Sequence, residues 1–206
     1  MWIQQNKFVF HLQDFSETQS AHLGKESTSL SRQNKQHVIH FNFLNSNEVH
    51  IADKKGKSTV YYNYFLGNDP SKWASDVHSY SEAVLGNLYD GIDLKLIEQE
   101  LNLKYEFIVQ PNIDPAQIKL QVAGASNLFI DPKGNLNVIT PAGNILEEKP
   151  YVYQIINGKI IEVSSKFVLD NDVLTFELGQ YDRSTQLIID PTLIFATYSG
   201  AVSDNF

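Results

Sequence analysis

The stretch YVYQIINGKIIEV, residues 151–163, decides the fold class of this chain. Two runs of strand-forming residues, 151–156 and 159–163, are separated only by Asn157 and Gly158. A two-residue turn of type I′ needs a positive φ at both central positions, and Asn and Gly tolerate that conformation best. The stretch therefore predicts an antiparallel β-hairpin in which Asn157 and Gly158 have a structural role.

Alternation of apolar and polar residues extends this pattern along most of the chain. In NLKYEFIV, residues 102–109, the apolar side chains fall on every second position. Neighbouring runs are separated by turns that are too short for a crossover helix, so we predict an all-β, antiparallel β-sandwich-like fold with many hairpins and little helix. Further strands are predicted at residues 8–12, 37–43, 59–64, 92–97, 118–122, 166–169 and 173–178, hairpin turns at 132–135, 141–144 and 170–172, and a short helical turn at 114–117.

The amino-acid composition and net charge limit the kinds of molecule that the chain could bind. The chain has 206 residues and a formal net charge of −8, which repels nucleic-acid phosphates, and its densest basic stretch, Lys54-Lys55-Gly56-Lys57, is predicted to be a turn. It has no cysteine, which excludes disulfides and zinc–thiolate sites. No apolar run approaches the roughly 20 residues that a membrane-spanning helix needs. We therefore expect no nucleic-acid partner and no membrane insertion.

Two breaks in the pattern suggest how the chain is organised. Residues 16–35 are rich in Ser, Gln and Thr and are predicted to form a long loop. Residues 67–72, GNDPSK, mark a boundary between an N-terminal strand-rich segment, 1–66, and a β-sandwich-like domain, 73–195. The pattern leaves open whether the first segment is separate or part of the same domain. Asp190-Pro191 is predicted to end a strand, because proline cannot donate to a strand ladder.

Carboxylates give one group of candidate site residues. Asp90 and Asp93 flank Gly91 in LYDGIDLKL, residues 88–96. Side chains in such a turn usually accept hydrogen bonds from nearby backbone N–H groups. Two alternatives remain open: a calcium site, since calcium prefers oxygen ligands, and a hydrolase with two carboxylates across a scissile bond. No other cofactor is expected, and the six histidines show no metal-binding spacing.

Aromatic residues give the second group of candidates. In the run Tyr61-Tyr62-Asn63-Tyr64-Phe65, strand alternation turns Tyr62 and Tyr64 to one face, and Trp73 follows shortly after. These rings could be buried between two layers, or they could form an exposed platform for a sugar or a peptide. An exposed, coplanar pair of rings would favour a carbohydrate-binding module.

A series of ordered motifs carries a family resemblance. Residues 89–94, YDGIDL, match the pattern Y-P-G-I-D-L except that Asp90 replaces proline. Residues 105–118 match the pattern L-E-Y-D-F-x-V-x-P-G-A-D-P-x-x-I from its tyrosine onward, with Asn112 and Ile113 where Gly and Ala are usual. IDPTLIFATYSG, residues 189–200, matches the closing motif. Over residues 73–200 or so the chain resembles the N-terminal β-rich domain that precedes SBBP-type β-propeller repeats in bacterial secreted and cell-surface proteins.

The resemblance implies a non-enzymatic module that acts as a cap, spacer or adhesion element ahead of the repeats. Its expected partners are the downstream β-propeller repeats of the same chain, with a glycan or a surface protein as further possibilities. Residues 196–206 would begin the first repeat, and Asp190-Pro191 would mark the edge of the domain. The opening MWIQQNKFVF lacks the features of a signal peptide, so an exported protein would have lost that segment.

Overall fold

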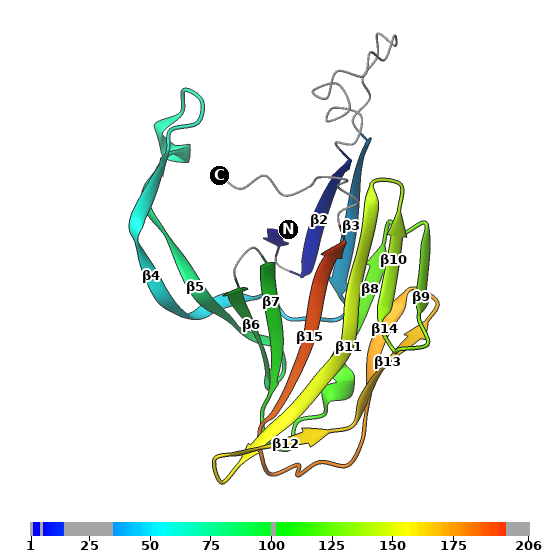
Figure 1. Ribbon diagram of the computed structural model, residues 1–206. Coiled ribbons are helices and arrows are strands. Elements are labelled where there is room, and N and C mark those ends of the chain that lie inside the picture. The colour runs from blue at the N-terminus through cyan, green and yellow to red at the C-terminus, as the bar shows by residue number, and fades with distance from the viewer. Residues whose placement is uncertain (1, 5, 15–34, 100–101, 197–206) are drawn as a thin grey trace, which may run out of the picture.

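The computed structural model describes residues 2–4, 6–14, 35–99 and 102–196, and it confirms the all-β, sandwich-like prediction (Figure 1). The described residues form fifteen strands, all paired antiparallel, and two short 3-10 turns. Apart from Lys35, the loop predicted at 16–35 lies outside these residues, as does the repeat predicted at 196–206 apart from Ala196.

The smaller sheet has six strands and combines three strands from the start of the chain with three from its later half. Its central pairings are β2 with β3 and β3 with β8, so strands from before and after residue 66 share one sheet. In spatial order it contains β1 (Trp2–Gln4), β2 (Lys7–Asp14), β3 (Lys35–Phe43), β8 (Leu120–Ala123), β14 (Val173–Leu178) and β13 (Ser165–Asp170).

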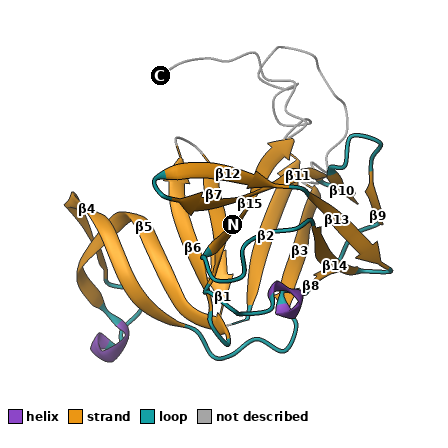
Figure 2. Cartoon of the chain, turned by 90° about the horizontal axis from the view of Figure 1, so that it is seen from below, coloured by secondary structure: helices purple, strands orange, loops and turns teal. Residues whose placement is uncertain are grey.

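The larger sheet has nine strands, and β4 forms one of its edges. In spatial order it contains β4 (His50–Tyr64), β5 (Ala74–Tyr89), β6 (Ile92–Gln99), β7 (Asn102–Val109), β15 (Leu187–Ala196), β11 (Gly143–Ile156), β10 (Leu136–Thr140) and β9 (Asn127–Ile130), while β12 (Lys159–Val163) pairs with β11. The 3-10 turns are η1 (Pro70–Lys72), at the outer end of β4 and β5, and η2 (Pro115–Gln117), which uses Asp114 as its cap (Figure 2).

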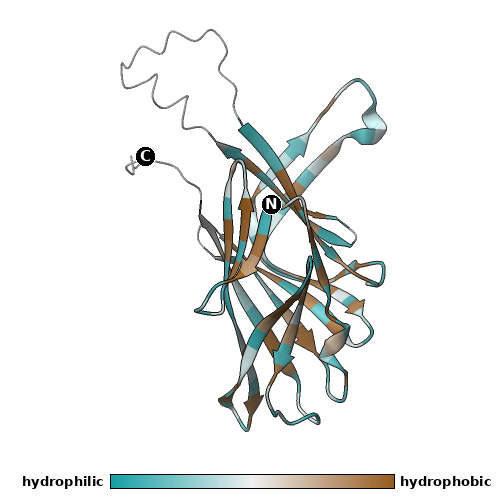
Figure 3. Cartoon of the chain, turned by 90° about the vertical axis from the view of Figure 1, so that its right-hand side faces the viewer, coloured by the Kyte–Doolittle hydropathy of each residue, from teal (hydrophilic) through white to brown (hydrophobic). Residues whose placement is uncertain are grey.

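Aromatic side chains join the two sheets. Hydrophobic and hydrophilic residues alternate along the strands (Figure 3), so each sheet turns one apolar face toward the other. Phe107 of β7 is fully buried and contacts Phe43 of β3 and Phe176 of β14, with ring centroids 6.3 and 6.0 Å away. Tyr105 of β7 meets Phe8 of β2 at 5.0 Å. The core therefore depends on residues from both halves of the chain.

The hairpin predicted at Asn157-Gly158 is present. Ile156 pairs with Lys159, and the two residues between them have φ values of 52° and 75°. Both central positions therefore have the positive φ that a type I′ turn requires.

Replacing Gly158 by valine should lower the free energy of unfolding by about 1 kcal/mol or more, because a β-branched residue is penalised at positive φ. No atom lies within 4 Å of the position of an added Cβ, so the cost comes from the backbone rather than from a clash. Urea denaturation measures the effect. Gly158→Asn is the matched control, since asparagine tolerates this conformation, and equal midpoints for the two variants would contradict the assignment.

The prediction of a turn at Lys54-Lys55-Gly56-Lys57 is wrong, because these four residues lie inside β4. Lys54, Lys55 and Lys57 pair with Ala83, Glu82 and Tyr80 of β5. Gly56 has a φ of 64° within the strand, and the register of β4 against β5 shifts at three places. Glycine here supplies an irregularity in a long strand and does not end it.

The break at residues 67–72 is a connection within one sheet. It links β4 and β5, which pair over most of their length, and so does not separate two structural units. The segments 1–66 and 73–195 contribute strands to the same two sheets. Strand β5, which follows this connection, was not predicted, because apolar and polar residues do not alternate regularly along it.

Asp190-Pro191 does not end a strand, which corrects the sequence prediction. Both residues lie inside β15, where the register against β11 shifts between Glu148 and Tyr151. Pro150 lies in the irregular part of β11, so prolines are present on both strands at the bulge. A bulge is a place where a strand tolerates a residue that lacks a backbone donor, and β15 therefore continues.

Candidate functional site

The outer parts of β4 and β5, with the connection between them, form an arm that projects from the two-sheet body (Figure 1). We define the arm as residues 53–83. None of the fifteen residues of β4 is buried, whereas β5 carries buried residues only from Leu85 onward. Leu85, Leu88 and Tyr89 thus anchor β5 in the core, and the arm extends beyond the reach of the core.

Local hydrogen bonds give the tip of the arm its shape. The Asp69 carboxylate accepts from the backbone N–H and the hydroxyl of Ser71 at 3.1 and 2.8 Å, which caps η1. The indole N–H of Trp73 donates to the Gly67 carbonyl at 3.2 Å. The side-chain oxygen of Asn63 accepts from the Asp76 N–H at 3.0 Å across the two strands. The conformation of the tip is therefore held by hydrogen bonds within the arm itself.

The predicted aromatic residues Tyr62, Tyr64 and Trp73 all lie on this arm and are exposed. Phe65 is 61% exposed, although a phenylalanine is usually buried. The rings of Tyr62 and Tyr64 lie 6.5 Å apart at 36°, and those of Phe65 and Trp73 lie 5.5 Å apart at 79°. The aromatic side chains are thus exposed and not buried between two layers. Neither pair of rings is coplanar, as a platform for a sugar would favour.

Asp90 and Asp93 lie at the β5–β6 turn and bind different groups. The Asp93 carboxylate accepts from the backbone N–H of Asn87 at 2.7 Å, and the Asp90 carboxylate accepts from the side-chain amide of Asn47 at 3.0 Å. Gly91 has a φ of 72°, and a Cβ there would lie 2.5 Å from Ile113. Among the described residues, no group of three or more His, Asp or Glu could hold a metal.

The structure also reveals a buried acid that the sequence analysis missed. Glu147 of β11 is fully buried and accepts a hydrogen bond from the Tyr105 hydroxyl, while its second oxygen has no partner among the described residues. Burial raises the pKa of Glu147 to about 7. The signal was present in the sequence, because Ile145 and Glu147 fall on the same face once 143–156 is recognised as a strand.

A second missed cluster lies on the opposite face of the larger sheet. Lys104 contacts Asp190 at 2.7 Å and Glu106 at 3.5 Å, and both carboxylates are largely buried. The rings of Tyr151 and Tyr153 lie nearby in β11, with centroids 5.3 Å apart. Burial and the charges of Glu106 and Asp190 raise the pKa of Tyr153. The cluster ties β7 to β15 next to the bulge.

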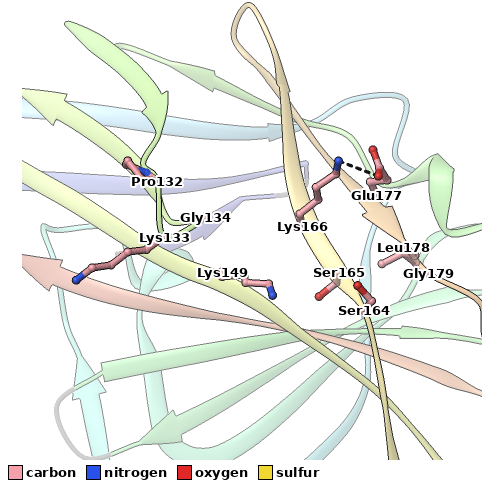
Figure 4. Close-up of a pocket in the computed structure, with 10 residues that line it drawn as sticks. All are labelled: Pro132, Lys133, Gly134, Lys149, Ser164, Ser165, Lys166, Glu177, Leu178 and Gly179. Atoms are coloured by element: carbon pink, nitrogen blue, oxygen red, sulfur yellow. Dashed lines mark ion pairs between the residues drawn. The ribbon is translucent and has the colours of Figure 1, made fainter.

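A pocket of about 480 Å³ opens where the β9–β10 turn meets the ends of β13 and β14 (Figure 4). We call it the lysine pocket, because three of its lining residues are lysines. Lys149 ends between Gly134 and Ser165, Lys166 pairs with Glu177 at 2.8 Å, and Lys133 extends away from the other labelled side chains. Its lining residues are Pro132, Lys133, Gly134, Lys149, Ser164, Ser165, Lys166, Glu177, Leu178 and Gly179.

Comparison with known proteins places the chain in a family. Neither the curated proteins nor the solved structures gave a match. Among the described residues, no helix is both long enough and apolar enough to cross a membrane. A family model described as a domain of unknown function, DUF7948, matches residues 1–192, which include both sheets up to Thr192 of β15, beside the bulge in β11. The chain therefore belongs to the DUF7948 family.

Proposed function

We propose that this domain is a non-enzymatic adhesion module of a bacterial secreted or cell-surface protein, in which the arm contacts a protein partner. The observation that carries the proposal is the group of exposed aromatic side chains on the arm. Tyr61, Tyr62, Tyr64, Phe65 and Trp73 are all more than 40% exposed. Tyr and Trp are enriched at the energetic centres of protein interfaces, and exposed apolar groups of this kind mark interaction sites.

The geometry of the rings favours a protein over a flat sugar as the partner of the arm. Phe65 meets Trp73 nearly edge-on, and Tyr61 is tilted by 54° against His78. A sugar ring stacks best on rings that share a plane, whereas protein side chains pack into an uneven surface. A carbohydrate-binding module that uses Tyr62, Tyr64 and Trp73 is therefore the second candidate. The bacterial context and the β-propeller repeats as further partners rest on the motif series.

The hydrolase alternative has less support. The two carboxylates of a glycosidase face each other across a scissile bond. Asp90 instead accepts a hydrogen bond from a side-chain amide, and Asp93 accepts one from a backbone N–H of another residue. The Asp93 hydrogen bond closes the local turn. This arrangement supports a structural role for both residues.

Adhesion by the arm can be tested with beads coated with the purified domain and added to intact cells of the source bacterium. The variant Tyr62→Ser/Tyr64→Ser/Phe65→Ser should lower the number of bound beads about tenfold or more, since interface aromatics each contribute about 2 kcal/mol when they are hot spots. Its thermal unfolding midpoint should stay near that of the wild type, because these side chains are exposed.

Ile160→Ser is the matched control, since Ile160 is as exposed as Phe65 but lies on β12 in the body. Protease treatment of the cells should abolish binding, whereas periodate oxidation of cell-surface sugars should not. Loss of binding after periodate alone would favour the carbohydrate-binding module. Equal binding by the triple variant and the wild type would overturn the role of the arm.

A further inference from the structure

The bulge in β11 directs Lys149 into the lysine pocket. The register against β15 shifts between Glu148 and Tyr151, so Lys149 lies in the irregular part of the strand. Bulges commonly re-aim a side chain in this way. The Lys149 stem lies beside Gly134, since a Cβ at Gly134 would be in ordinary van der Waals contact with the lysine Cγ, at 3.5 Å. The amino group of Lys149 then ends between Gly134 and Ser165 (Figure 4).

Hydrogen bonds hold the walls of the pocket in place. The Asp131 carboxylate accepts from the N–H groups of Asn135 and Lys133 at 3.0 and 2.8 Å, and these bonds hold its pKa below the usual value. The Asn135 side-chain oxygen accepts from the Lys149 N–H at 3.1 Å, which ties the turn to the bulge.

The opposite wall is tied down in the same way. The Ser165 hydroxyl donates to the Pro150 carbonyl at 2.6 Å, and the Gly179 N–H donates to the Ser164 carbonyl at 2.7 Å. The first bond links β13 to the bulge, and the second links the end of β14 to the start of β13. The pocket is therefore formed before any ligand arrives, which lowers the cost of ordering on binding.

The charged groups of the pocket suit a ligand with both an anionic group and hydroxyl groups. Lys149 has no carboxylate within ion-pair distance among the described residues, although the chain as a whole is acidic. Lys166 and Glu177 form an exposed pair that offers a donor and an acceptor side by side. Such a pair can exchange hydrogen bonds with neighbouring hydroxyls of a sugar ring.

The size and lining of the pocket agree with this chemistry. A volume of about 480 Å³ lies within the usual range for small organic ligands and is larger than a simple inorganic anion needs. Most of the lining side chains are charged or polar, and only Pro132 and Leu178 are apolar. A polar organic ligand therefore fits better than an apolar one.

We propose that the lysine pocket binds an acidic sugar, whose carboxylate contacts Lys149 and whose ring hydroxyls contact Lys166, Glu177 and Ser164. This site is independent of the arm and goes beyond the adhesion proposed above. The acidic sugar could be a free sugar acid or a unit of an acidic polysaccharide, since both present the same carboxylate and hydroxyl groups.

Isothermal titration calorimetry with D-galacturonate tests the proposal, with methyl galactoside as the neutral probe and sodium sulfate as the simple anion. The wild type should bind galacturonate and neither of the other two probes at the same concentration. Lys149→Met keeps the stem and removes the charge, so it should weaken galacturonate binding about tenfold or more, because a charge-assisted hydrogen bond is lost.

Lys159→Met is the matched control, because it removes the same charge from an exposed lysine of β12 that does not line the pocket. It should keep the affinity within about twofold of the wild type. Trigalacturonate distinguishes the two sources: tighter binding than the monomer indicates a polysaccharide, and equal binding indicates a free or terminal acid.

The proposal is overturned if neither galacturonate nor its trimer binds, if sulfate binds as tightly, or if Lys149→Met and Lys159→Met behave alike. The arm variant Tyr62→Ser/Tyr64→Ser/Phe65→Ser should bind galacturonate as the wild type does. A failure of adhesion by the arm and a failure of the lysine pocket are therefore distinguishable.

Discussion

Replacing Phe107 by alanine should lower the free energy of unfolding by about 3–5 kcal/mol, which is the usual cost of deleting a buried phenylalanine ring. Phe107 is fully buried, and its ring contacts those of Phe43, Tyr105 and Phe176. Two of these partners belong to the smaller sheet, so the variant leaves a cavity at the junction of the two sheets. Urea denaturation followed by tryptophan fluorescence and circular dichroism measures the loss.

Phe129→Ala is the matched control for this experiment. Phe129 lies on the edge strand β9 and is 39% exposed, so the same chemical change should cost about 1 kcal/mol or less. A similar loss of stability in the two variants would contradict the central position that we give to Phe107.

The stability of the protein should fall as the pH rises from about 5 to about 8, because of Glu147. Burial raises the pKa of this carboxyl to about 7 in the folded protein, whereas in the unfolded chain it keeps the ordinary value of 4.5. Between these values the folded state holds a proton that the unfolded state has released. Raising the pH therefore favours unfolding. The full loss of unfolding free energy that results from ionising Glu147 is present above a pH of about 7.

The size of the effect is on the order of 3 kcal/mol, since each pKa unit corresponds to about 1.4 kcal/mol. Glu147→Gln removes the titration and keeps the shape of the side chain. We expect the difference in unfolding free energy between the wild type and Glu147→Gln to shift by this amount between pH 5 and pH 8, against the wild type. A difference that does not change with pH would show that Glu147 is ionised throughout or has an ordinary pKa.

Much of the fold could be predicted because alternation and turn chemistry are local signals. Tyr105 and Phe107 alternate with polar residues, so β7 was predicted with its buried face, and Asn157-Gly158 identified a hairpin. Asp190-Pro191 misled because the effect of a proline depends on the neighbouring strand. The register shift in β11 that lets β15 continue cannot be seen in the sequence of β15 alone.

The candidate sites were predictable to different degrees. The density of aromatic residues around Tyr62 and Tyr64 was visible in the sequence, but their exposure depends on how far β4 extends beyond the core. The lysine pocket could not be predicted, because Gly134, Lys149 and Lys166 come from separate elements that only the tertiary structure brings together. Glu147 was missed because its strand was recognised only in part.

The irregular course of β4 has a consequence for solubility. A straight outer strand of fifteen residues would offer a row of free backbone groups on which other chains could assemble into aggregates. Lys54, Lys55 and Lys57 repel a like strand, and the positive φ of Gly56 and the shifts in register interrupt the straight edge. The exposed aromatic arm is therefore a poor template for the growth of fibrils.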